Sequence, residues 1–434
     1  MFLAAFLFHF YLVAKYAVDI PFWDDWSHLP VHSNFSWVFA FHNEHRVPVT
    51  RLLVLILYHL NGWNIAQHQI LNFIIYGGVV MLTVFAIANW VPGWKKWMSA
   101  AFCIVLFSPV AAENHQWATQ TNWHVYLLFT LCSTILLFRE RQTSLSLIAG
   151  SFMAIGLVYS IVSGVISAVV LLIVWTWFHF TRTPVPQRSS RALAGQWCLV
   201  GVPIILSIML YFQGYEHPAS HKAPAAPWTL AFWNYYGTII DSGFAGPQKI
   251  SEAFPCLGIL AVFALCILPL ILAGRVVRKR TFTFPLGYWR LFSVTSAFLA
   301  GIALIAFGRG NFPSSSAFSG RYAELSVFLM PLGAASWYWA LQSRPTLRRK
   351  TMFFLLVVFL AAHGRLYWRF ESYRINHEQR THQLELIAQY YAAPTQEPYY
   401  LPDFWVQMNS YFEEAQTLNV SFYRKLMESQ PKNP

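Results

Sequence analysis

The chain has 434 residues, of which 56% are hydrophobic and only 11% are charged, and its net charge is +12 at pH 7. Soluble proteins of this size carry about a quarter charged residues, so an ordinary soluble globular protein is excluded. The basic residues are scattered in short groups, and no long Lys/Arg run favours a nucleic-acid partner. This composition predicts an all-α, polytopic transmembrane helical bundle.

Repeated apolar stretches of roughly 17–20 residues are each long enough to cross a bilayer core of about 30 Å. They predict about eleven spans, at 2–18, 69–91, 97–112, 124–138, 145–160, 164–179, 197–213, 255–274, 291–308, 325–342 and 351–367. The uncharged stretch 145–179 is too long for one crossing at about 1.5 Å per residue. We therefore expect it to cross twice, with Gly164 at the turn.

The basic residues also predict the orientation. If the N-terminus is cytoplasmic, every inner loop is basic, as the positive-inside rule requires, and Glu140 is the one acid there. The inner basic residues are Lys95, Lys96, Arg139, Arg141, Arg182, Arg188, Arg191, Arg275, Arg278, Lys279, Arg280, Arg290, Arg344, Arg348, Arg349 and Lys350. We expect a transmembrane domain over 1–367, with an outer loop at 19–68, and a small outer helical region over 368–434.

The first outer loop carries a pair of carboxylates, Asp24 and Asp25, between Trp23 and Trp26. Acidic side chains near lipid are costly unless they serve a function. Solvated loop carboxylates are the alternative interpretation. The loop also predicts interfacial helices at about 48–60 and 29–41, because these amphipathic segments are too short to span.

Further polar residues gather in the outer loops. The first loop contains His42, Glu44, His45 and Arg46 within one pentapeptide, which could equally be a surface ion cluster. The second loop contains Glu113 and His115, which could equally cap a helix.

The fifth outer loop contains Arg309, Arg321 and Tyr322 around a Gly/Ser-rich segment. Two arginines at such a loop could hold a phosphate or diphosphate. Ordinary snorkelling of the arginines to the interface is the alternative.

This combination resembles the C-type glycosyltransferase superfamily (GT-C), and within it bacterial members like the aminoarabinose and protein mannosyl transferases. The likeness lies in one span followed by an Asp-Asp-Trp pair, interfacial helices in the same loop, many further spans and an outer C-terminal region. Asn43-Glu44-His45-Arg46 and the later Arg309, Arg321 and Tyr322 are similar to poorly characterised bacterial relatives. The layout covers most of residues 1–367.

The resemblance implies an inverting transferase at the outer face of a bacterial inner membrane. It would move a sugar from a polyprenyl-phosphate donor to a glycan or lipid acceptor of the cell envelope. A first-loop acid would be the general base, with Asp25 slightly preferred to Asp24 and with Glu44 as a further catalytic candidate.

The same resemblance implies donor-phosphate binding by Arg309, Arg321, Tyr322 and Arg46. Substrate contacts are expected from His42, His45, Glu113, His115 and Trp26. No cofactor is required, although a divalent cation, Mg²⁺ or Mn²⁺, on Asp24, Asp25, Glu113 or His115 stays open.

Two other functional classes stay open, as does a membrane protein without catalytic activity. A lipid-linked glycan polymerase or ligase would use arginines in large outer loops and would not need the acidic pair. A lipid or solute transporter would place ionisable residues at the bilayer midplane, whereas the predicted spans are almost free of charge.

Overall fold

The computed structural model describes the chain except residues 31–34, 183–189, 219–220, 246–247, 281–283, 368–370, 394, 396, 402–406 and 430–434. The described residues are mostly helical, with no strand and one isolated β-bridge between His42 and His45. Arg188 lies outside the described residues, as does part of the predicted interfacial segment 29–41. The side chains of Arg182, Arg191, Arg278, Lys279 and Arg280 are not described either.

The N-terminal half contains α1 (Phe2–Tyr16), η1 (Trp23–His28), α2 (Phe35–Phe39), α3 (Pro48–Asn61), α4 (Ile65–Trp90), α5 (Lys96–Leu106), η2 (Pro109–Ala111), α6 (Ala112–Gln116), η3 (Ala118–Gln120), α7 (Thr121–Leu137), α8 (Ser144–Val158), α9 (Val162–Arg182) and α10 (Ser190–Phe212). The C-terminal half contains α11 (Leu230–Gly243), α12 (Gln248–Ala253), α13 (Cys256–Val262), the π-helical η5 (Phe263–Ile267), α14 (Leu268–Arg280), α15 (Leu286–Arg309), η6 (Ser314–Phe318), α16 (Gly320–Val327), α17 (Leu329–Ala340) and α18 (Pro345–Tyr367), followed by α19 (Glu371–Ala392), α20 (Asn409–Thr417) and α21 (Ser421–Ser429).

Each of the eleven predicted apolar segments coincides with one or more of these helices. Among the described residues, six helical stretches are long and apolar enough to cross a membrane, and α1, α3 and α8 are shorter apolar helices. The six stretches are Ile65–Trp90, Lys96–Gln116, Val162–Thr181, Leu193–Phe212, Cys256–Arg275 and Leu286–Arg309. A helical membrane-embedded protein is therefore supported, while eleven crossings and their orientation stay predictions.

The uncharged stretch 145–179 forms two helices, as expected, but the position of the turn was wrong. The chain reverses at 159–161, between α8 and α9, and Gly164 lies inside the first turn of α9. A Cβ atom at Gly164 would lie 1.8 Å from the carbonyl oxygen of Leu157. The glycine is therefore needed for the close approach of the two helices rather than for the turn itself.

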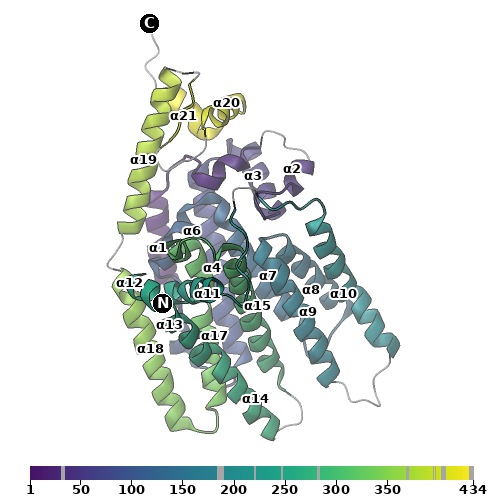
Figure 1. Cartoon of the computed structure of the whole chain (residues 1–434). Coiled ribbons are helices and arrows are strands. Elements are labelled where there is room, and N and C mark those ends of the chain that lie inside the picture. The colour runs from purple at the N-terminus through teal and green to yellow at the C-terminus, as the bar shows by residue number, and fades with distance from the viewer. Residues whose placement is uncertain are drawn as a thin grey trace.

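The helices form one bundle, shown in Figure 1, with α4, α7 and α15 near its middle and α10 along one edge. Close packing joins α15 to α9, α7 to α8 and α10 to α8. A continuous apolar core runs through this bundle. Arg51 of α3 is buried and donates to the carbonyl oxygens of Trp37 and Ala40, both at 2.5 Å.

The C-terminal helices α19, α20 and α21 pack on the first loop at one end of the molecule (Figure 1). A second apolar cluster joins the two regions, with the ring of Trp26 against Phe412 (5.5 Å) and Phe422 (5.6 Å). Asp19 accepts hydrogen bonds from Lys425 at 2.6 Å and from Ser421 at 2.7 Å. The predicted region 368–434 therefore shares its core with the predicted loop 19–68.

Candidate functional site

A cavity of about 310 Å³ lies between the first loop and the helix bundle, within the usual size range of small-molecule sites. Seven of the predicted site residues line it: Asp24, His42, Glu44, His45, Arg309, Arg321 and Tyr322. Its apolar wall includes Ile161, Val162, Leu304, Ile305 and Phe307, from the start of α9 and the end of α15. Polar groups from segments far apart in the sequence thus face one apolar wall.

A tight two-residue turn presents the central polar residues. The backbone N–H of His42 donates to the carbonyl of His45 at 2.8 Å, and the N–H of His45 donates back at 2.9 Å. Asn43 adopts the left-handed conformation (φ 50°), which asparagine tolerates better than most residues. The turn is held to α9 because the N–H of Val162 donates to Nδ1 of His45 at 3.3 Å.

Glu44 is the centre of an ionic cluster inside the cavity. Its carboxylate lies 2.6 Å from the Arg309 guanidinium, 3.1 Å from Nδ1 of His221 and 3.6 Å from Nε2 of His45. Burial by itself raises the pKa of Glu44, but the charges of His45 and Arg309 outweigh burial and lower it to about 2. Glu44 is therefore ionised at neutral pH, and it already neutralises Arg309.

Asp24 is open to the cavity, and its side chain is 38% exposed. Its carboxylate lies 3.6 Å from Nε2 of His42. The hydroxyl of Ser27 donates to the Asp24 carbonyl oxygen at 2.7 Å and lies 3.0 Å from Nδ1 of His42. Burial raises the pKa of Asp24, but the hydrogen bond and charge of His42, with the charge of Arg321, hold it well below its usual range. Asp24 therefore presents an ionised carboxylate.

Among the arginines that line the cavity, Arg321 has the guanidinium with the fewest hydrogen-bond partners. Its guanidinium carbon lies 5.6 Å from the ring centre of Trp117 and 5.2 Å from that of Tyr322. The guanidinium makes no hydrogen bond within the described part of the chain, and its Nε is buried. Although burial lowers the pKa of Arg321, Tyr322, Glu113 and Asp24 raise it above its ordinary value. A charged fork with free donors is suited to a phosphate.

Asp25 does not face the cavity, unlike Asp24. It is fully buried, and its carboxylate accepts hydrogen bonds from the backbone N–H groups of Thr119 (2.9 Å) and Phe22 (3.1 Å). Burial raises its pKa to about 6, although these hydrogen bonds and the charge of Arg380 oppose the shift. The slight preference for Asp25 as the base rested on sequence position alone, and the geometry favours Asp24.

Arg46, Glu113, His115 and Trp26 do not line the cavity either. Arg46 donates to the carbonyls of Phe39 (2.6 Å), Tyr211 (2.9 Å) and Gln213, so its donors are occupied by backbone. Glu113 accepts from the N–H of Gly320 (2.8 Å) and the hydroxyl of Ser319 (3.0 Å), which ties α6 to the start of α16. Nδ1 of His115 lies 2.9 Å from the hydroxyl of Tyr373. These side chains hold the site together from outside it.

The four candidate metal ligands therefore point to different partners. Asp24 faces the cavity, Asp25 and Glu113 accept backbone N–H groups, and His115 meets Tyr373. Within the described ranges, no group of three or more His, Cys, Asp or Glu residues is arranged to hold a metal ion. The divalent-cation option therefore stays an untested prediction, and the proposed reaction is derived from the side chains alone.

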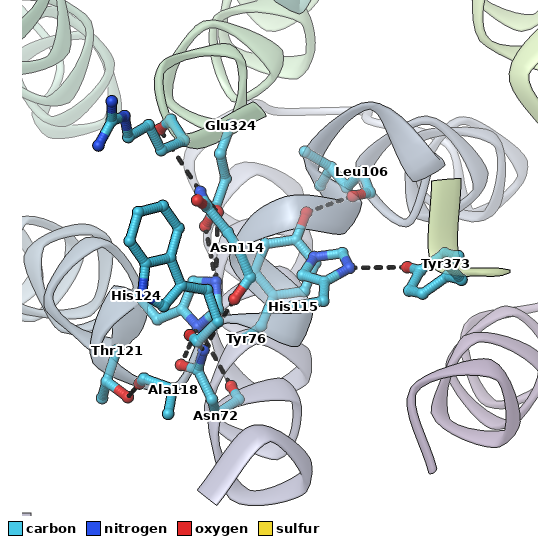
Figure 2. A network of polar contacts seen from close by, with 12 residues as sticks. Asn72, Tyr76, Leu106, Asn114, His115, Ala118, Thr121, His124, Glu324 and Tyr373 are labelled. Carbon is cyan, nitrogen blue, oxygen red and sulfur yellow. Dashed lines mark hydrogen bonds and ion pairs between the residues drawn. The ribbon is translucent and has the colours of Figure 1, made fainter. Parts of the chain in front are cut away.

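A buried polar network lies behind the cavity (Figure 2). Nε2 of His124 lies 3.1 Å from the Glu324 carboxylate, and its Nδ1 lies 2.6 Å from Oδ1 of Asn72. Asn114 donates both to the Glu324 carboxylate and, at 3.4 Å, to the carbonyl of Arg321. The network therefore positions the first turn of α16, which carries Arg321 into the cavity.

Some lining residues had no predicted role. His28, Asn122, Trp123, His217 and His221 all face the cavity. The density of His and acidic residues in Glu216-His217 and His221 was a usable signal in the sequence. His28 and Asn122 had none, because only tertiary packing brings them to this surface.

The chain matches no protein-family model, and no curated protein or solved structure shows significant similarity to it. The chemistry of the cavity is therefore the main guide to function.

Proposed function

We propose that the chain is a membrane glycosyltransferase that moves a sugar from a polyprenyl-phosphate donor to a hydroxyl group of a cell-envelope glycan or lipid. One observation carries the proposal: the ionised Asp24 and the unbonded guanidinium of Arg321 line the same cavity, which is also lined by apolar side chains. A lipid phosphate needs a cation and an apolar surface, and an attacking hydroxyl needs a nearby base.

In the proposed step, the acceptor oxygen attacks the anomeric carbon and its proton passes to the Asp24 carboxylate. The bond between the anomeric carbon and the phosphate oxygen breaks, and its electron pair leaves with the polyprenyl phosphate. Arg321 stabilises the charge that develops on that phosphate. A single displacement of this kind inverts the anomeric configuration.

The roles of the remaining polar residues follow from their pairing. Arg309 is neutralised by Glu44 at 2.6 Å, so we assign it to shaping the cavity and give the phosphate contact to Arg321. His42 lies beside Asp24 and orients its carboxylate toward the cavity. Tyr322 and Trp123 supply aromatic lining on which a sugar ring can stack.

The decisive experiment compares Asp24→Asn with Asp25→Asn, because the same change is made at adjacent carboxylates of which one faces the cavity. Sugar transfer from a panel of polyprenyl-phosphate donors is measured with purified protein in lipid nanodiscs. We expect Asp24→Asn to lower turnover by about 10²–10⁴-fold while donor binding survives. Asp25→Asn, where folded, keeps its turnover. Full turnover in Asp24→Asn would remove the proposed base.

Donor binding tests Arg321 separately. Arg321→Ala should abolish binding of the polyprenyl-phosphate donor, and Arg321→Lys should restore part of it. The lysine ammonium is a point charge, whereas a guanidinium can donate to two phosphate oxygens at once. A polymerase or ligase that uses polyprenyl diphosphate would instead lose activity in Arg321→Ala and keep it in Asp24→Asn.

A further inference from the structure

A second cavity, of about 540 Å³, lies at the opposite end of the bundle from the C-terminal helices. It is formed by Lys95 and the start of α5, by Tyr338 of α17 and by the start of α18, whose far end leads to α19 (Figure 1). Lys95, Arg348 and Arg349 supply its charge, and Trp97, Tyr338 and Phe353 supply aromatic surface. No residue assigned to the proposed transfer reaction lines it.

The three cations have no acidic partner within the described ranges. None of them forms an ion pair with a described residue, and no acidic residue lines the cavity. Three unpaired positive charges around one cavity repel one another, and an anion between them would relieve that repulsion.

One of the cations is pre-oriented. The guanidinium carbon of Arg348 lies 4.5 Å from the ring centre of Tyr338. The hydroxyl of Tyr338 donates to the carbonyl of Gly93, and its ring packs edge-on against Trp94 at 5.5 Å. The stacked arginine therefore loses little further freedom when it binds a ligand.

The cavity also lies where the chain changes from polar to apolar. The second turn of helix α18 carries the basic run Arg348, Arg349 and Lys350, and the helix continues with an apolar sequence. Trp97 is 54% exposed and Phe353 is 67% exposed, as expected for side chains at a lipid boundary. A ligand here would meet charge at one side and exposed aromatic surface at the other.

We propose that this cavity binds the headgroup of an anionic glycerophospholipid. The phosphate lies among Lys95, Arg348 and Arg349, and the acyl chains run along Trp97 and Phe353. Basic pockets between transmembrane helices recognise such headgroups by charge, and the adjacent apolar surface distinguishes a lipid from free phosphate. This proposal does not depend on the transferase assignment.

The test uses delipidated full-length protein in neutral detergent, with native mass spectrometry to measure bound lipid. Phosphatidylglycerol is the anionic probe, phosphatidylcholine the zwitterionic one and glycerol 3-phosphate the soluble one. We expect phosphatidylglycerol to bind most tightly. At about fivefold per cation, Arg348→Gln/Arg349→Gln should weaken it by roughly twenty-five-fold.

The matched control is Arg344→Gln/Lys350→Gln, which removes the same charge from the segment around the start of α18, at residues that do not line the cavity. It should cause a much smaller loss, and Lys95→Gln tests the other wall independently if the double variant fails to fold. Equal losses in both double variants, or equal binding of the two phospholipids, would overturn the proposal. Glycerol 3-phosphate binding as tightly as phosphatidylglycerol would overturn it in favour of a soluble phosphate ligand.

Discussion

Arg380 of the C-terminal region is buried near the first loop, and its electrostatic effect on Asp25 can be measured. Arg380 of α19 is 1% exposed, and its guanidinium carbon lies 4.5 Å from the ring centre of Phe22. It donates to the carbonyl of Gln116, and its charge acts on the buried carboxylate of Asp25. Arg380→Met keeps most of the side-chain volume but leaves Asp25 without its cation. We expect a loss of about 1–3 kcal/mol in the free energy of unfolding at pH 8, because the carbonyl of Gln116 loses its buried donor and Asp25 loses a nearby positive charge.

The loss should depend on pH. The pKa of Asp25 in the folded protein is about 6, above its ordinary value of 3.8, so its ionisation costs stability as pH rises through this window. Without Arg380 the pKa of Asp25 rises further, and the penalty extends to higher pH. Near pH 5, Asp25 is mostly protonated in both folded proteins, so the part of the loss due to the pair should shrink.

A double-mutant cycle isolates the pair. Wild type, Arg380→Met, Asp25→Asn and the double variant are unfolded in detergent at pH 5 and pH 8. We expect a coupling of about 0.5–3 kcal/mol at pH 8 that shrinks at pH 5. Arg374→Met is the control on the same helix, because Arg374 is exposed and its ion pair with Glu378 is worth at most about 1 kcal/mol. Additive losses at both pH values would refute the pairing and leave the apolar cluster to hold the region.

Other changes test the remaining structure. Gly164→Ala should lower the free energy of unfolding by about 1–3 kcal/mol, because its Cβ would lie 1.8 Å from the carbonyl oxygen of Leu157. An unchanged melting temperature would show that the α8–α9 turn adjusts freely. Arg46→Ala removes hydrogen bonds to three backbone carbonyls, so limited proteolysis should cut the first loop faster. An unchanged cleavage pattern would show that other contacts hold the first loop in place. Glu324→Gln should cost about 1–3 kcal/mol of unfolding free energy and weaken donor binding through Arg321; normal donor binding would separate the buried network from the cavity.

The sequence alone determined the helical architecture. In lipid, backbone polar groups must be satisfied within a helix, so apolar length is a strong guide, and all eleven apolar segments coincide with helices. The sequence also predicted some of the residues that line the cavity, namely Asp24, His42, Glu44 and Arg321. They are polar groups in aromatic, apolar surroundings. Such residues are conspicuous because their burial near lipid is costly.

Tertiary structure decided which of these residues face the cavity. Asp24 and Asp25 are adjacent and chemically identical, yet the carboxylate of Asp25 pairs with the backbone of Thr119, 94 residues away, and Asp24 opens to the cavity. Arg46 and Arg321 are likewise both arginines in predicted outer loops. The guanidinium of Arg46 donates to backbone carbonyls, whereas that of Arg321 makes no hydrogen bond within the described residues. Whether each side chain faces the cavity depends on hydrogen-bond partners from distant segments. The local sequence does not indicate which partner a side chain will contact once the helices pack.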